Sequence, residues 1–270
     1  GSYGEPLGYQ DMATSDLVKA FAVLEKTFGI DFTTTTNVRD TYLYPLYATY
    51  ADGRTPDFGD DDGFTYKYPL AGNTFMWLSY RMKNPWTYYY VSKSFEAGRV
   101  GFPGYFWRPE GVTPKSREEL VPSHHFAGKG NMVMRSGWSD ECSILQFRCG
   151  PNANHYHVDQ GTFRLTTNGE MLITEAGMEG GYYTNLNYPG YNIQPIGHNT
   201  MLVDNDAESQ VPGDYENTIA ALRNHPRITN SFAGWHADEA EGDITSVYKG
   251  KIECYTRSWL YMKPDIIFLY

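Results

Sequence analysis

The period of the hydrophobic pattern changes near residue 122 of this 270-residue chain, and this change constrains the fold most. Before it, apolar residues recur at the spacing that places them on one face of a helix. After it, short apolar runs alternate with turn-forming residues, as they do in antiparallel strands. We therefore predict two domains, a helical domain at residues 1–121 and a β-domain at residues 122–270.

The helical domain is expected to contain a helix over residues 17–28, where apolar residues follow helical spacing. Residues 14–15, a threonine and a serine, are predicted to cap this helix, and Gly29 is predicted to end it. Weaker helical patterns follow at residues 38–50 and 75–82.

The β-domain has the pattern of an antiparallel β-sandwich, with many short strands separated by turns. Asn168 and Gly169 form a strong signal for a two-residue hairpin. Strands are expected at residues 131–136, 143–149, 161–167, 170–175, 200–203, 244–249, 252–260 and 266–270. Because the last strand ends the sequence with apolar residues, an edge that proteins usually protect, we expect this chain to be part of a longer polypeptide.

Composition limits the classes of partner. The net charge of −10 argues against nucleic acid, whose phosphates need clustered Lys and Arg. No run of 18 apolar residues is present, so we predict no membrane-spanning helix. The three cysteines form no C-x-x-C pair and are interpreted as buried thiols. An aromatic content of 16% favours carbohydrate binding, and almost equally an all-β core.

The densest group of chemically active side chains surrounds His155 and His157. Residues two apart on a strand face the same side, so both imidazoles could reach one metal ion. The predicted hairpin brings Glu175 near them, and His198 begins a later strand. Two histidines with one carboxylate form a plausible zinc set, and three histidines form the alternative set. Histidines that serve only as hydrogen-bonded structural residues are the simpler interpretation.

Several segments, in consistent order, resemble the heparinase II/III-like polysaccharide lyases. They include the His-x-His segment and the Glu-x-x-x-Tyr pattern that ends at Tyr9. The matching segments are residues 1–9, 134–138, 145–151, 155–163, 169–177 and 198–200.

The resemblance implies a fold and a reaction. The fold is the C-terminal part of an incomplete (α/α) toroid at residues 1–121, followed by an antiparallel β-sandwich at residues 122–270, with the chain truncated at both ends. The active site is expected between the two domains. The reaction is β-elimination of a uronic-acid-containing glycan, of the heparin, heparan sulfate or alginate type.

The resemblance also implies roles for individual residues. Tyr9 matches the catalytic tyrosine, which would protonate the leaving oxygen, and His155 matches the catalytic histidine, which would remove the C5 proton. Zinc would be held by His157, Glu175 and His198 and would brace the site. Glu175 departs from the family pattern, which more usually has Asp at that position.

Four further residues are expected to contact an acidic polysaccharide substrate. They are Glu5, Arg135, Asn154 and Tyr191. For Arg135, packing against the nearby Trp138 is the structural alternative.

Two other functions remain open at this stage: a catalytically inactive carbohydrate-binding sandwich, and a zinc-dependent hydrolase. The size of a polymeric substrate indicates a periplasmic or secreted protein. A homodimer is compatible with the sequence.

Overall fold

A computed structural model of the chain describes most of its residues. They are residues 7–35, 43–50, 52–54, 58–59, 72–96, 98, 101, 106–151, 157–177, 186–211 and 225–270. The chain divides into two compact units. The helical unit consists mainly of Leu7–Pro56 and Gly63–Leu120, and the strand unit mainly of Asp57–Asp62 and Val121–Tyr270.

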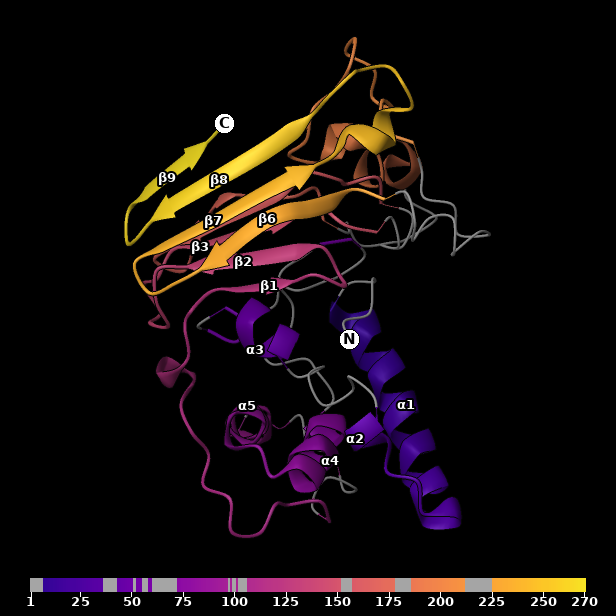
Figure 1. Ribbon diagram of the computed structural model, residues 1–270, viewed down its shortest axis with the longest axis vertical. Helices are drawn as coiled ribbons and strands as arrows, with labels where there is room; N and C mark the ends of the chain where they lie inside the picture. The colour runs from indigo at the N-terminus through magenta and orange to yellow at the C-terminus, as the bar shows by residue number, and fades with distance from the viewer. Residues whose placement is uncertain are drawn as a thin grey trace. The chain divides into compact units, whose positions relative to one another are not determined.

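The helical unit contains five α-helices among the described residues (Figure 1). They are α1 (Leu7–Phe28), α2 (Phe32–Thr35), α3 (Leu43–Ala48), α4 (Gly72–Met82) and α5 (Pro85–Glu96), followed by the 3-10 turn η2 (Arg117–Glu119). Helix α4 packs against both α1 and α5. The expectation that these helices end a toroid stays a prediction.

Helix α1 starts earlier than predicted. Thr14 lies inside it, where its hydroxyl donates to the Gln10 carbonyl at 2.7 Å, so the predicted cap was wrong. The predicted end was right: the Gly29 amide donates to the Glu25 carbonyl at 2.8 Å. Gly29 has a φ of 69°, which glycine adopts without a steric penalty.

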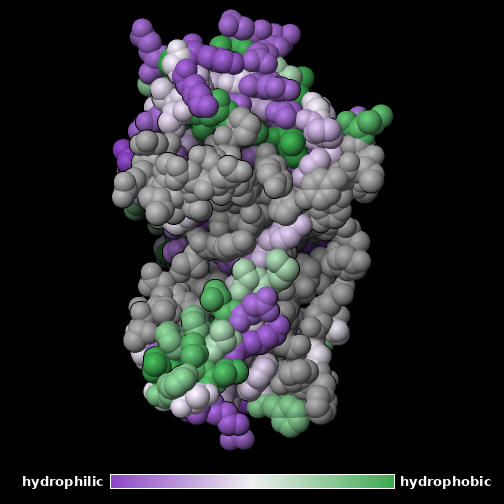
Figure 2. All heavy atoms as spheres, turned by 90° about the vertical axis from the view of Figure 1, so that its right-hand side faces the viewer, coloured by the Kyte–Doolittle hydropathy of each residue, from purple (hydrophilic) through white to green (hydrophobic). Residues whose placement is uncertain are grey.

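Apolar side chains also lie on the surface of α1. Met12, Leu17, Val23 and Phe28 are all exposed. Apolar residues gather on one face of the helical unit (Figure 2). Among the helices described here, none is long and apolar enough to cross a membrane.

The first sheet of the strand unit is antiparallel, and its described strands lie in sequence order. They are β1 (His124–Phe126), β2 (Asn131–Arg135), β3 (Ile144–Arg148), β4 (Phe163–Thr167) and β5 (Glu170–Ile173). The predicted hairpin joins β4 to β5, and Asn168 and Gly169 have φ values of 51° and 74°. Positive φ at both positions is what a type I′ turn requires.

The second sheet is also antiparallel and in sequence order (Figure 1). Its described strands are β6 (Arg227–Ala233), β7 (Ala237–Asp243), β8 (Thr256–Met262) and β9 (Ile266–Leu269). Two predicted strands were wrong, because residues 200–203 form no strand and residues 245–248 form the 3-10 turn η6 (Thr245–Tyr248).

The core of the strand unit lies between its two sheets, which confirms the antiparallel two-sheet architecture. The first sheet contributes Met132, Met134, Leu145 and Phe147, and the second contributes Ala240, Trp259 and Tyr261. The rings of Phe147 and Trp259 lie 6.0 Å apart, and the ring of Phe163 lies 4.7 Å from Trp259. Burial of each such large side chain stabilises the unit by about 1.5–3 kcal/mol.

Candidate functional site

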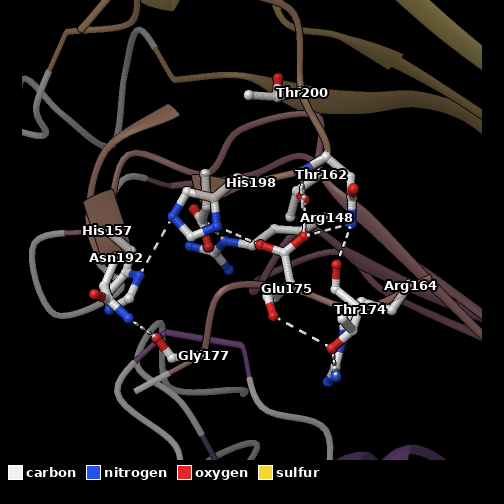
Figure 3. Close-up of polar contacts among 12 residues, drawn as sticks. Arg148, His157, Thr162, Arg164, Thr174, Glu175, Gly177, Asn192, His198 and Thr200 are labelled. Atoms are coloured by element: carbon white, nitrogen blue, oxygen red, sulfur yellow. Dashed lines mark hydrogen bonds and ion pairs between the residues drawn. The ribbon is translucent and has the colours of Figure 1, made fainter. Parts of the chain in front are cut away.

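Three of the predicted metal ligands lie together in the strand unit (Figure 3). His157 belongs to the loop between β3 and β4, Glu175 follows β5, and His198 follows the 3-10 turn η5 (Pro195–Gly197). All three side chains are buried. Residues from three separate connections therefore converge on one polar cluster inside an otherwise packed unit.

The two imidazoles face each other through ring nitrogens. Nδ1 of His157 lies 3.4 Å from Nε2 of His198. This distance exceeds the usual range of a hydrogen bond that a nitrogen donates. The edge of the Tyr188 ring faces the His157 ring, with centroids 6.3 Å apart. The pair of histidines is thus held in a fixed orientation within a buried environment.

Glu175 lies on the other side of His198. Its Oε2 contacts Nδ1 of His198, the nitrogen opposite the one that faces His157. Its Oε1 accepts hydrogen bonds from the Thr162 hydroxyl and from the backbone and side-chain amides of Asn199, the last two at 3.3 Å and 3.1 Å. Both oxygens of the Glu175 carboxylate therefore contact hydrogen-bond donors of the protein.

The Glu175 carboxylate also changes the proton affinity of His198. Burial lowers the pKa of His198, but the charge and the hydrogen bond of Glu175 outweigh burial and raise that pKa above its usual range. When the His198 imidazole is neutral, its contact with Glu175 favours the proton on Nδ1. This tautomer leaves a lone pair on Nε2, the nitrogen directed at His157.

The histidine pair fits a zinc ion better than the predicted set of three ligands does. Zn–N bonds of about 2.0–2.1 Å in a tetrahedral site place two nitrogens about 3.3–3.4 Å apart, which matches the observed separation. A carboxylate on the other nitrogen of a ligating histidine orients that ring. Within the described ranges, no three His, Cys, Asp or Glu side chains are arranged to hold a metal. The ligand role of Glu175 stays a prediction that this geometry does not favour.

Arg135 packs inside the strand unit. It is fully buried on β2, its guanidinium lies 4.7 Å from the Trp138 ring, and its Nε donates to the Gly137 carbonyl at 3.2 Å. These contacts favour the structural alternative, packing against Trp138, and the expected substrate contact stays a prediction.

Tyr191 remains compatible with a substrate contact. It belongs to the short π-helical segment η4 (Tyr188–Asn192), and its side chain is 48% exposed. The neighbouring Asn192 is buried and donates through Nδ2 to the Gly177 carbonyl at 2.9 Å. Tyr188 of the same segment faces the His157 ring, with centroids 6.3 Å apart, so η4 borders the cluster.

The roles expected for the remaining site residues stay predictions. Glu5, Asn154 and His155 lie outside the described residues. Tyr9 lies on α1 in the helical unit and is partly buried. The prediction that Tyr9 and His155 act on one sugar therefore stays a prediction.

Several polar residues that support the site were not predicted. Arg148 and Asp159 form a buried ion pair at 2.9 Å at the base of the loop that carries His157. Asn199 donates to the Phe163 and Thr174 carbonyls at 3.0 Å and 2.6 Å. Spacing in the sequence indicates none of these contacts. The only available signal was the high density of polar residues between Arg148 and Gly161.

Almost half of the chain matches a known protein family. Residues 119–245 match the family described as Heparinase II/III-like, C-terminal. No curated protein matches the sequence significantly.

Solved structures with the same fold include a heparan sulfate lyase and a heparinase. Heparan sulfate lyase HepC from Pedobacter heparinus superposes with a TM-score of 0.68 and 17% identity, over 97% of this chain and 36% of that chain. Heparinase III, the BT4657 gene product, superposes with a TM-score of 0.69 and 15% identity, over 100% of this chain and 38% of that chain. This chain thus spans little more than a third of the length of these proteins.

Proposed function

Because residues 119–245 belong to the heparinase II/III-like family, we propose that this protein is a polysaccharide lyase that cleaves a uronic-acid-containing glycan by β-elimination. The observation that carries the proposal is that the matched segment contains the buried cluster of His157, Glu175 and His198. A heparan sulfate-type glycan is the first candidate substrate, since one structure of similar fold is a heparan sulfate lyase.

The reaction requires a base and an acid. In the proposed mechanism His155 removes the proton on C5 of the uronate, and a neutral imidazole suits this task because its unperturbed pKa is about 6.5. Tyr9 donates a proton to the departing O4, and tyrosine suits this task because it stays protonated at neutral pH. The carbon–oxygen bond at C4 breaks, and a C4–C5 double bond forms in the product.

The buried cluster of His157, Glu175 and His198 would stabilise the structure around the proposed base. His157 and His198 would hold a zinc ion, and Glu175 would hold the His198 ring through Nδ1. The ion would stabilise the fold around the site, since elimination needs no metal-activated water. His157 lies two residues after His155, so an ordered His157 restrains the position of the proposed base.

Two alternative functions are separated from lyase activity by one assay. A lyase produces an unsaturated uronate that absorbs in the ultraviolet, whereas a zinc-dependent hydrolase cleaves the glycan without this absorbance. An inactive carbohydrate-binding sandwich binds the glycan and cleaves nothing. The assay uses heparan sulfate, heparin and alginate as separate substrates. Cleavage without the absorbance would overturn the proposal.

Two substitutions test the roles of the acid and the base. Tyr9→Phe removes only the phenolic hydroxyl, and His155→Ala removes the imidazole. Each should abolish the absorbance increase while the circular dichroism spectrum and melting temperature stay unchanged. Tyr191→Phe is the matched control for the loss of a tyrosine hydroxyl, and it should act on KM more than on kcat. Full activity of Tyr9→Phe would contradict the assignment of the acid.

The proposed substrate also bears on location and assembly. A polymer of this kind is cut outside the cytoplasm, so we place the protein in the periplasm or outside the cell. Fractionation of the producing cells tests this location. Sedimentation analysis would decide whether the protein forms a homodimer.

A further inference from the structure

We propose that Arg148 and Asp159 are positioning residues that hold together the two ends of the loop from Pro151 to Asp159. This inference rests on the proposed function, because that loop carries His155, the proposed base. Neither residue is assigned to the reaction. Their charges act on His198 in opposite directions, since Asp159 raises its pKa and Arg148 lowers it.

The first observation is the place of the two residues at the ends of the loop. Arg148 is the last residue of β3, and Asp159 lies four residues before β4 begins. The backbone ladder of these strands continues to the base of the loop: the Arg148 amide donates to the Thr162 carbonyl, and the Gly161 amide donates to the Arg148 carbonyl, both at 2.9 Å. The two ends of the loop therefore start from a rigid base.

The second observation is that the Arg148 side chain contacts both ends of the loop. Its Nε donates to Oδ1 of Asp159 at 2.9 Å, and its Nη2 donates to the Pro151 carbonyl at 2.9 Å. Its Nη1 lies 3.4 Å from the side-chain oxygen of Asn131 on β2. The planar guanidinium of Arg148 thus fixes the distance between the start and the end of the loop. Its contact with Asn131 also fixes both ends to the sheet.

The third observation is burial. The side chains of Arg148 and Asp159 are each 1% exposed. An ion pair removed from water is retained only with well-placed partners, since each charge loses its hydration. Gln160 supports the same base, because its side-chain oxygen accepts from the Gly150 amide at 2.8 Å and its Nε2 donates to Asp159 at 3.3 Å.

These contacts explain why the pair would matter for the reaction. A base must lie within hydrogen-bond reach of the proton that it removes, and a displacement of about 1 Å can cost about 100-fold in rate. The contacts of Arg148 fix Pro151 and Asp159, the two ends of the segment that contains the proposed base. This clamp touches no substrate in this proposal, so it should affect kcat rather than KM.

Two substitutions and one matched control test the clamp. Asp159→Asn keeps the shape of the side chain and an oxygen acceptor but removes the charge. Arg148→Lys keeps the charge but removes the planar set of donors. The control is Asp238→Asn, which alters another deeply buried ion pair of the strand unit, between Asp238 and Lys263 at 3.0 Å, away from this loop.

The measurements are kcat, KM and hydrogen exchange followed by mass spectrometry, well below the melting temperature. We expect Asp159→Asn and Arg148→Lys to lower kcat at least about tenfold, to change KM less than about twofold, and to speed exchange in residues 150–160 at least about tenfold. Asp238→Asn should lower the melting temperature but leave kcat and exchange in this segment unchanged.

Each outcome decides the proposal. Unchanged exchange in residues 150–160 would show that the pair does not hold the loop. Faster exchange with unchanged kcat would show that the clamp does not position the base. An equal loss of kcat in Asp238→Asn would attribute the effect to general destabilisation and overturn the proposal.

Two further results separate this proposal from the proposed function. If the unsubstituted protein cleaves none of the glycans, the lyase proposal fails, and the exchange measurement still decides whether the clamp exists. If neither variant folds, hydrogen exchange in the unsubstituted protein decides whether the clamp exists. The amides of Gly150 and Gly161 should then be protected as strongly as those of β3, and rapid exchange there would overturn the clamp.

Discussion

The buried pair of Asp238 and Lys263 offers the sharpest test of what stabilises the strand unit. Nζ of Lys263, in the turn after β8, lies 3.0 Å from Oδ2 of Asp238 on β7 and 2.9 Å from Oγ of Ser123. The Ser123 hydroxyl donates to the same Asp238 oxygen at 2.6 Å, and its Oγ accepts from the Arg135 amide at 2.9 Å. The cluster therefore joins the two sheets at one end of the sandwich.

We predict that Lys263→Met destabilises the protein because Asp238 then stays buried without a counter-charge. Asp238 is fully buried, and loss of one partner of such a pair costs about 3–5 kcal/mol. We expect a loss near the lower end of this energy range, since Ser123 and the Gly234 amide still donate to the Asp238 carboxylate. A loss of about 3 kcal/mol corresponds to a fall in melting temperature of about 6–12 °C for a domain of this size.

The effect should depend on pH in a stated direction. Burial raises the pKa of Asp238 above its usual range, although Ser123 and Lys263 act against this shift. A carboxyl group whose pKa is raised by folding stabilises the folded state at low pH, and this contribution is lost as the pH rises through the folded-state pKa. The deficit of Lys263→Met should therefore be larger at pH 8 than at pH 5.

Thermal unfolding by calorimetry at several pH values measures this deficit. The double variant Lys263→Met/Asp238→Asn carries neither charge and should be more stable than Lys263→Met at neutral pH. A loss below about 1 kcal/mol at neutral pH, or a loss that does not change with pH, would refute the role assigned to the buried charge.

Three further predictions follow from other contacts. Burial lowers the pKa of His125. The neutral imidazole therefore stabilises the folded state above about pH 6.5, and this contribution is lost as the pH falls. In His125→Gln the melting temperature should fall less steeply below this pH. A methyl group on Gly150 would lie 2.5 Å from a backbone oxygen, so Gly150→Ala should lower the melting temperature by several degrees, whereas Gly137→Ala, where nothing lies within 4 Å, should not. Elemental analysis should show that His157→Ala loses zinc, whereas Glu175→Gln retains it with affinity reduced about 10–100-fold; loss of zinc in both would restore Glu175 as a ligand.

Local signals in the sequence were reliable where a single turn decided the structure. Gly29 ends α1, and Asn168 with Gly169 forms the hairpin between β4 and β5, because only a few residue types adopt positive φ without strain. Both outcomes depend on backbone sterics within a few residues. No distant part of the chain was needed to predict them.

Strand β7 was missed because its buried face does not consist of large apolar residues. Its sequence, Ala-Asp-Glu-Ala-Glu-Gly-Asp, has no hydrophobic alternation. Small residues are required there by the opposite sheet: a Cβ on Gly242 would lie 2.7 Å from the Phe147 ring and 2.9 Å from Sγ of Cys149. The size of a residue on β7 is therefore set by residues almost one hundred positions earlier.

The sequence by itself determined that the chain changes from helices to strands, because periodicity is a property of neighbouring residues. Motif order, through the family resemblance, predicted that His157, Glu175 and His198 lie together. Only the tertiary structure decided the roles of similar side chains. Arg135 packs on Trp138, whereas Arg148 binds Asp159 and Pro151. Partners of a buried charge come from separate segments, and folding alone brings those segments together.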